Sequence, residues 1–213
     1  MNTLGVLMLD TRFPRIVGDI GNPKSFDFPV RYHRVAGASP QRVVRERDTA
    51  LLQPFIEASR ALVAEGATAI TTSCGFLVLF QRALQAALPV PVWSSSLLLL
   101  AELKSVGVVT VDATSFGADH LRAAGASADT PIEGLAPGCA FQRCLLEDDA
   151  TLDIDDACAQ TVGSALRLTA RHPAISTIVL ECTNMPPYAD AVRAATGREV
   201  HDITTLLRQR FQT

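Results

Sequence analysis

The chain has 213 residues, of which 48% are hydrophobic and 19% charged, and its formal net charge is −3. These values are typical of a globular protein with a sizeable core, arranged as one large domain or two small ones. The slightly acidic balance argues against a nucleic-acid partner. The arginines near position 45 alternate with Glu46 and Asp48, as on a solvated helix face.

The chain gives no sign of a membrane or secretory segment. Its N-terminus begins on a strand-like run, without the basic and apolar pattern of a signal peptide. The longest apolar runs, such as 97–101, are far too short to cross a bilayer. The cysteine count is odd and no CxxC occurs, which predicts free thiols in a reducing, cytoplasmic setting. The five cysteines are Cys74, Cys139, Cys144, Cys158 and Cys182.

Strand and helix patterns alternate through the first half. A turn-rich loop, 10–23, follows the first strand. Apolar residues at helical spacing predict a long helix that ends before Gly66, and Ser95 is suited to cap another helix. We predict strands at 3–9, 28–35, 67–73 and 90–93, and helices at 40–65, 76–87 and 95–104.

The second half repeats this order, although 136–150 has no clear pattern. Two prolines, Pro186 and Pro187, stand where the first turn of a helix tolerates them. Strands that alternate with helices predict parallel sheets covered on both faces. We predict strands at 106–111, 130–135, 175–181 and 199–202, and helices near 114–124, at 153–171, from Pro186, and at 203–211.

Cys74 and Cys182 mark equivalent points of an internal repeat. Each follows a short apolar, β-branched run, and the two lie 108 positions apart. The segment 92–99 recurs at the same spacing as 200–207. The chain therefore reads as a duplicated α/β unit that carries one thiol in each copy.

The predicted fold class is α/β, with two pseudo-symmetric three-layer αβα domains, mainly parallel sheets and an active site in the cleft between them. The first domain is expected to span 1–98 and the second 99–202. The last helix, 203–213, is placed to pack back onto the first domain. A homo-oligomer, most plausibly a dimer, is expected.

Ligands of parallel α/β sheets bind at the carboxyl ends of the strands, where both thiols are predicted to lie. Each thiol also precedes a helix, whose free N–H groups favour an anion and are expected to lower the thiol pKa. Small polar residues at 71–73, with Thr183 and Asn184, suit a bound carboxylate. A free cysteine is more often a packing residue, and we assign Cys139, Cys144 and Cys158 to that role.

Two segments carry a family resemblance: 71–76, which reads Thr-Thr-Ser-Cys-Gly-Phe, and 180–186, which reads Leu-Glu-Cys-Thr-Asn-Met-Pro. With the strand and threonine loop at 106–114, they resemble the aspartate/glutamate racemase superfamily, which includes hydantoin racemases, maleate isomerases and arylmalonate decarboxylases. The resemblance covers nearly the whole chain and does not specify the substrate.

The resemblance implies a cofactor-free, metal-free racemase or epimerase that acts next to the carboxylate of an amino acid or hydantoin-type derivative. One thiolate removes the proton from that carbon, and the opposing thiol returns one to the other face. Cys74 and Cys182 are the implied catalytic residues. The candidate substrate-binding residues are Ser73, Gly75, Thr114, Thr183, Asn184, Asp10 and Arg12.

The chain departs from glutamate racemases at three positions. Asp10 stands about two positions after the usual aspartate, Asn184 replaces a histidine, and Glu181 replaces a common glycine. Arg12 and Arg15 are equally suited to bind a second carboxylate or to form surface ion pairs. His201 ends a strand at the same edge and has no neighbouring ligand set.

Other functions remain open. A maleate-isomerase-like enzyme would add a thiolate to a double bond. An arylmalonate-decarboxylase-like enzyme would need just one of the two thiols. A non-catalytic protein could instead close its two lobes around a small carboxylate.

Overall fold

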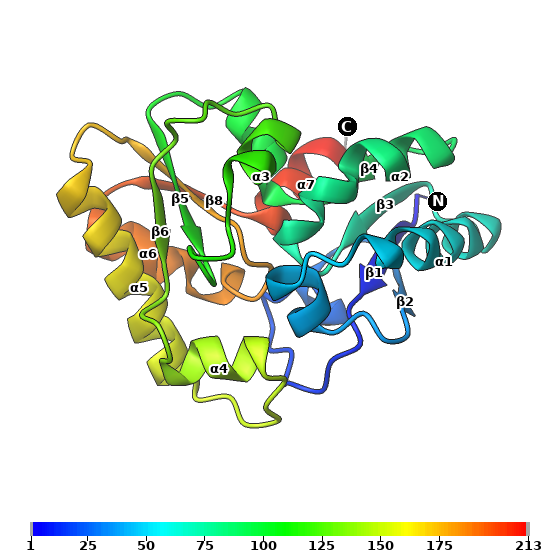
Figure 1. The fold of residues 1–213 in the computed structure, drawn as a ribbon, viewed down its shortest axis with the longest axis horizontal. Coiled ribbons are helices and arrows are strands. Elements are labelled where there is room, and N and C mark those ends of the chain that lie inside the picture. Colours follow the sequence, from blue (N-terminus) through cyan, green and yellow to red (C-terminus); the bar gives the residue numbers. More distant parts are fainter. Residues whose placement is uncertain (1, 212–213) are drawn as a thin grey trace.

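The computed structural model describes residues 2–211, which form two lobes, each built on a four-stranded parallel sheet (Figure 1). The strand order is β2-β1-β3-β4 in the first lobe and β6-β5-β7-β8 in the second, so the two lobes share one topology. The predicted duplicated α/β fold is thus confirmed. The strands are β1 (Leu4–Met8), β2 (Val30–Arg34), β3 (Ala69–Thr72), β4 (Val92–Trp93), β5 (Val106–Thr110), β6 (Ile132–Gly134), β7 (Thr177–Leu180) and β8 (Glu199–His201).

Helices cover both sheets, as the apolar strands require. Every residue of β3 and of β7 is buried, because these central strands have a neighbour on each side and helices on both faces. The α-helices are α1 (Leu52–Ala64), α2 (Gln81–Ala87), α3 (Ala118–Ala123), α4 (Ala140–Leu146), α5 (Ile154–Arg171), α6 (Ala189–Thr196) and α7 (Ile203–Phe211).

Several short helical turns replace longer helices that the sequence predicts. The segments after Cys74 and Ser95 are 3₁₀ turns, although Ser95 caps the second of them by accepting from Leu97 N at 3.2 Å. The turns are η1 (Pro23–Ser25), η2 (Gln41–Arg45), η3 (Thr49–Leu51), η4 (Gly75–Phe80), η5 (Ser96–Ala101) and η6 (Pro186–Tyr188), of which η2 is π-helical.

The prediction of one helix over 40–65 is wrong. Arg47 takes a left-handed conformation with φ of 50°, which interrupts the helix. Asp48 then starts a new turn, because its carboxylate accepts from Ala50 N at 2.9 Å and pairs with Arg42. An aspartate that bonds nearby backbone and side-chain donors in this way competes with helix continuation. The helix α1 therefore begins only at Leu52.

The C-terminal helix α7, red in Figure 1, crosses back to the first lobe, where its Phe211 packs on Trp93 of β4 with ring centroids 6.4 Å apart. Its buried residues Ile203, Leu206 and Leu207 share a core cluster with Leu4 and Val6 of β1. Positions 1 and 212–213, which the predicted domain and helix include, lie outside the described residues. Over residues 2–211, none of the helices combines the length and apolar character that a membrane span needs.

Candidate active site

Both repeated thiols line a single cavity between the lobes. Cys74 lies two residues after the end of β3, and Cys182 lies two residues after the end of β7. The space between the walls of the cavity, including the solvent at its opening, is about 340 Å³. Its polar lining consists of Ser73, Cys74, Gly75, Glu181, Cys182, Thr183 and Asn184.

Direct hydrogen bonds join the two lobes beside the thiols. The Thr183 hydroxyl donates to the carbonyl of Ser73 at 2.7 Å, and the Ser96 hydroxyl donates to the carbonyl of Leu180 at 2.8 Å. The Ser73 hydroxyl in turn accepts from the backbone of Leu9 at 2.8 Å. These bonds hold the segments that carry Cys74 and Cys182 against each other.

The remaining wall of the cavity is apolar and comes largely from segments that the repeat did not indicate. Leu145 and Leu146 belong to α4, within the stretch 136–150 that has no clear sequence pattern. The other apolar lining residues are Leu9, Phe13, Pro40, Val44 and Val111. The cavity therefore combines an apolar wall with polar groups near the thiols.

The expected low thiol pKa is wrong for both cysteines. Burial, together with the nearby Glu181 carboxylate, raises the pKa of Cys74 to about 12 and that of Cys182 well above its ordinary value. Backbone N–H groups of Phe76 and Leu77 do point at Cys74, and they lower its pKa as a helix N-terminus should. Their effect is smaller than the loss of water around the sulfur.

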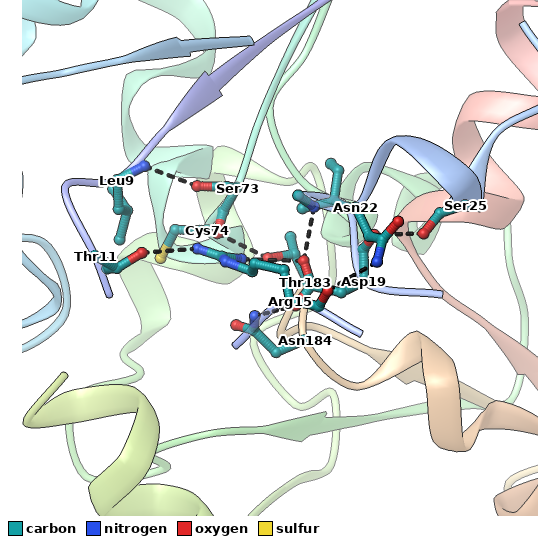
Figure 2. A network of polar contacts seen from close by, with 12 residues as sticks. Leu9, Thr11, Arg15, Asp19, Asn22, Ser25, Ser73, Cys74, Thr183 and Asn184 are labelled. Carbon is teal, nitrogen blue, oxygen red and sulfur yellow. Dashed lines mark hydrogen bonds and ion pairs between the residues drawn. The ribbon is translucent and has the colours of Figure 1, made fainter. Parts of the chain in front are cut away.

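A polar network that sequence reasoning missed connects Cys182 to the loop after β1. Figure 2 shows its members Thr11, Arg15, Asp19 and Asn184. The thiol of Cys182 donates to Asn184 Oδ1 at 3.4 Å, and the Asn184 amide donates to the buried Asp19. Asp19 pairs with Arg15 at 3.1 Å, and Arg15 also donates to Thr11 at 3.1 Å. Asp19 carries no motif, and its position in a turn-rich loop gave no signal.

Arg15 lies beside the first thiol as well. In Figure 2 its side chain extends from the loop toward Cys74, whose pKa it lowers. Its guanidinium stacks on Phe13 at 4.3 Å from the ring centroid. One arginine thus links the apolar wall, the network to Cys182 and the Cys74 thiol.

Three other predicted residues lie outside the cavity lining. Thr114 donates to Asp112 at 2.6 Å and faces a separate pocket beside β6. Asp10 accepts from Gly37 N at 3.1 Å and pairs with Arg34. Arg12 is exposed and pairs with Asp148 at 3.2 Å.

His201 and the three remaining cysteines do not line the cavity either. His201 contacts Glu199 at 2.8 Å. Cys139 caps α4, Cys144 is a buried residue of the same helix, and Cys158 lies on α5. Across residues 2–211, no three histidine, cysteine or acidic side chains are grouped so that they could hold a metal ion.

Several solved structures share this fold. The chain is similar to unliganded arylmalonate decarboxylase, with a TM-score of 0.61, 16% identity, and coverage of 96% of this chain and 88% of that one. It is also similar to a putative Asp/Glu racemase from Yersinia pestis, with a TM-score of 0.60, 13% identity, and coverage of 97% and 95%. The chain thus shares the two-lobed α/β fold of these proteins.

Sequence comparison identifies the family of the chain. The chain is 32% identical over 216 residues to a dimethylsulfoniopropionate lyase of Durusdinium sp. clade D. The match covers 94% of this chain and 71% of that protein. It is 31% identical to dimethylsulfoniopropionate lyase 7 of Emiliania huxleyi strain CCMP1516, over 95% of this chain and 64% of that protein. The chain belongs to the family of these lyases. No protein-family model matches it.

Proposed function

We propose that this chain is a lyase that eliminates a leaving group from a small carboxylate, with dimethylsulfoniopropionate as the first substrate to test. The observation that carries the proposal is the pair Cys74 and Cys182 in one small cavity, in a chain 32% identical to a lyase of that name. The chain spans only 71% and 64% of the lengths of the two relatives, so the activity itself is part of the proposal.

The reaction requires one base. A thiolate removes a proton from the carbon next to the carboxylate, and the freed electron pair forms a double bond to the neighbouring carbon. The bond from that carbon to sulfur breaks, and its electrons leave with neutral dimethyl sulfide. Acrylate remains, and the thiol later returns its proton to water. No oxidant, reductant or cofactor is needed to balance these steps.

The charges of this substrate suit a site with buried, neutral thiols. A positive sulfonium placed beside Cys74 or Cys182 would favour the thiolate and so offset the burial that raises its pKa. The sulfonium methyl groups would lie against the apolar wall formed by Phe13, Leu145 and Leu146. The negative end would lie near the backbone N–H groups that point at the sulfurs.

Product release tests the proposal. Purified protein incubated with dimethylsulfoniopropionate should release dimethyl sulfide, measured by headspace gas chromatography, and acrylate, measured by NMR. Replacing the thiol that acts as the base with serine, as Cys74→Ser or Cys182→Ser, should lower kcat/KM at least about a hundredfold, because general bases contribute about that much. Cys158→Ser is the matched control and should keep full activity. Wild-type protein that releases no dimethyl sulfide would contradict the proposal.

Two-thiol racemisation is the second candidate, favoured by the equivalent placement of Cys74 and Cys182 at the ends of β3 and β7. It predicts exchange of the α-proton of an amino acid or hydantoin for deuterium in D₂O, with both single serine variants inactive. An elimination needs one base, so substitution of the other cysteine should then be tolerated in part. The pattern of the two variants therefore distinguishes the reactions.

A further inference from the structure

Glu181 is a buried carboxyl group at the junction of the lobes. It is 1% exposed, and its Oε2 atom accepts from the hydroxyl of Thr110 at 2.8 Å. The backbone N–H of Val111 lies close enough to lower the pKa of the carboxyl group. Its other oxygen, Oε1, is buried and has no hydrogen-bond partner among the described residues. An unpaired buried carboxyl oxygen is costly, so its retention calls for a function.

The carboxyl group lies directly against the segment that carries the first thiol. A Cβ atom added to Gly75 would come within 3 Å of Glu181 Oε1, Cδ and the carbonyl oxygen. Glu181 also immediately precedes Cys182 in the chain. Ser73 holds the equivalent position in the first repeat, so the cavity has an acid on just one of its two matched sides.

A charge on Glu181 acts on both thiols, since it raises the pKa of Cys74 and of Cys182. The other charged side chains that act on them are Arg15, which lowers the pKa of Cys74, and Asp19, which raises that of Cys182. Arg15 and Asp19 are paired with each other at 3.1 Å. Burial raises the pKa of Glu181 itself to about 7, while the Thr110 hydroxyl and the Val111 N–H lower it.

We propose that Glu181 is a positioning residue that tunes the acidity of Cys74 and Cys182: its carboxylate makes both thiols harder to ionise, and its protonation makes them easier to ionise. The physical reason is that one buried cavity disfavours two negative charges. The catalytic consequence rests on the proposed function, in which a thiolate is the base. The control of acidity itself does not.

Alkylation by iodoacetamide tests this without any substrate. The rate at each cysteine is followed by mass spectrometry from pH 5 to pH 10. In the wild-type protein, the logarithm of the rate at Cys74 or Cys182 should rise with pH, level off from near pH 7 over about one pH unit, and then rise again. The plateau arises because Glu181 loses its proton there and makes each thiol harder to ionise.

Glu181→Gln removes the charge and keeps an oxygen that can accept from Thr110. In this variant the rate should rise without a plateau and should be about tenfold higher than in the wild type above pH 8. Glu133→Gln is the matched control, because Glu133 is also buried but pairs with Arg167 and Arg171 in the second lobe, and it should keep the plateau.

Two results would overturn the proposal: a wild-type profile without a plateau, or a Glu181→Gln profile that keeps one. The wild-type profile decides the matter by itself if the variant does not fold. A plateau that Glu181→Gln removes, in a protein that releases no dimethyl sulfide, would contradict only the proposed function.

Discussion

The chemistry of single residues in this cavity is set by burial. Cys74, Cys182 and Glu181 are all withdrawn from water, and burial is the largest cause that raises the pKa of each. Burial therefore favours the neutral forms of all three acids over their charged forms. A cationic substrate would supply the opposite charge just where the base must form.

Stability should depend on pH through Glu181. Its pKa in the folded protein, about 7, exceeds the ordinary value of 4.5, so the folded state holds a proton that the unfolded chain releases above pH 4.5. The stability that Glu181 contributes in its neutral form is therefore fully present below pH 4.5 and is lost as the pH rises through 7. Between pH 4.5 and pH 8, we expect the free energy of unfolding of the wild type to fall by up to about 3 kcal/mol relative to that of Glu181→Gln.

Urea unfolding of both proteins at several pH values measures this difference. The Glu133→Gln variant provides the comparison for the loss of a carboxylate elsewhere. Equal pH dependence in the wild type and Glu181→Gln would show that Glu181 titrates alike in the folded and unfolded chains.

At the scale of elements, the site depends on how the turn after β3 meets the end of β7. The turn η4 begins at Gly75, which has no side chain, and this allows the backbone to lie against Glu181. Hydrogen bonds from Thr183 and Ser96 hold the same two segments together. The close approach of the lobes is thus built from small residues at the ends of the central strands.

Gly75→Ala should disrupt this contact. The added Cβ would overlap both the side chain and the backbone oxygen of Glu181, so a change of rotamer cannot relieve it. We expect a loss of about 1–3 kcal/mol in the free energy of unfolding, as for other overpacked sites, together with reduced activity.

Gly163→Ala is the matched control. Gly163 lies inside α5, where an added Cβ meets only Arg167 Nη1 at 3.6 Å. Alanine is the better helix former, so this change should stabilise the protein by about 0.5–1 kcal/mol in the same urea titration. A Gly75→Ala protein as stable as the wild type would argue against close packing of η4 on Glu181.

The whole molecule is tied together across its two lobes. Phe76 of the first lobe packs on Phe116 and His120 of the second, with ring centroids 5.7 and 4.9 Å apart. Arg47 also pairs with Asp119 at 2.9 Å between the lobes. The helix α7, which follows the last strand of the second sheet, adds its apolar face to the first lobe.

Because of these contacts the two lobes should unfold in one transition. Leu206→Ala should lower the free energy of unfolding by about 2–5 kcal/mol, since Leu206 is 1% exposed in the core beneath α7. Fluorescence of Trp93, the single tryptophan, reports on the first lobe, and far-UV circular dichroism reports on both. The unfolding midpoints from fluorescence and from circular dichroism should coincide, and Leu206→Ala should shift both by the same amount.

Leu166→Ala is the control for this change, because Leu166 is 44% exposed on α5 and should shift the midpoint little. Separate midpoints for fluorescence and circular dichroism would mean that each lobe unfolds independently.

Much of this architecture could be predicted from local patterns. Local patterns indicated all eight strands, and the repeat indicated two lobes with Cys74 and Cys182 at equivalent strand ends. Strand alternation and turn residues are properties of neighbouring positions, and the duplication is visible as a repeated spacing along the chain. The sequence alone therefore determined these features.

Tertiary structure decided the rest, because burial and contact join residues that are far apart in the chain. The apolar wall from α4 and the link from Asp19 to Asn184 have no signature in spacing. The sign of the thiol pKa shift was also beyond local reasoning. The helix N-terminus was foreseeable, but the loss of water around Cys74 and Cys182 arises only when both lobes close over them, and that loss is the larger effect.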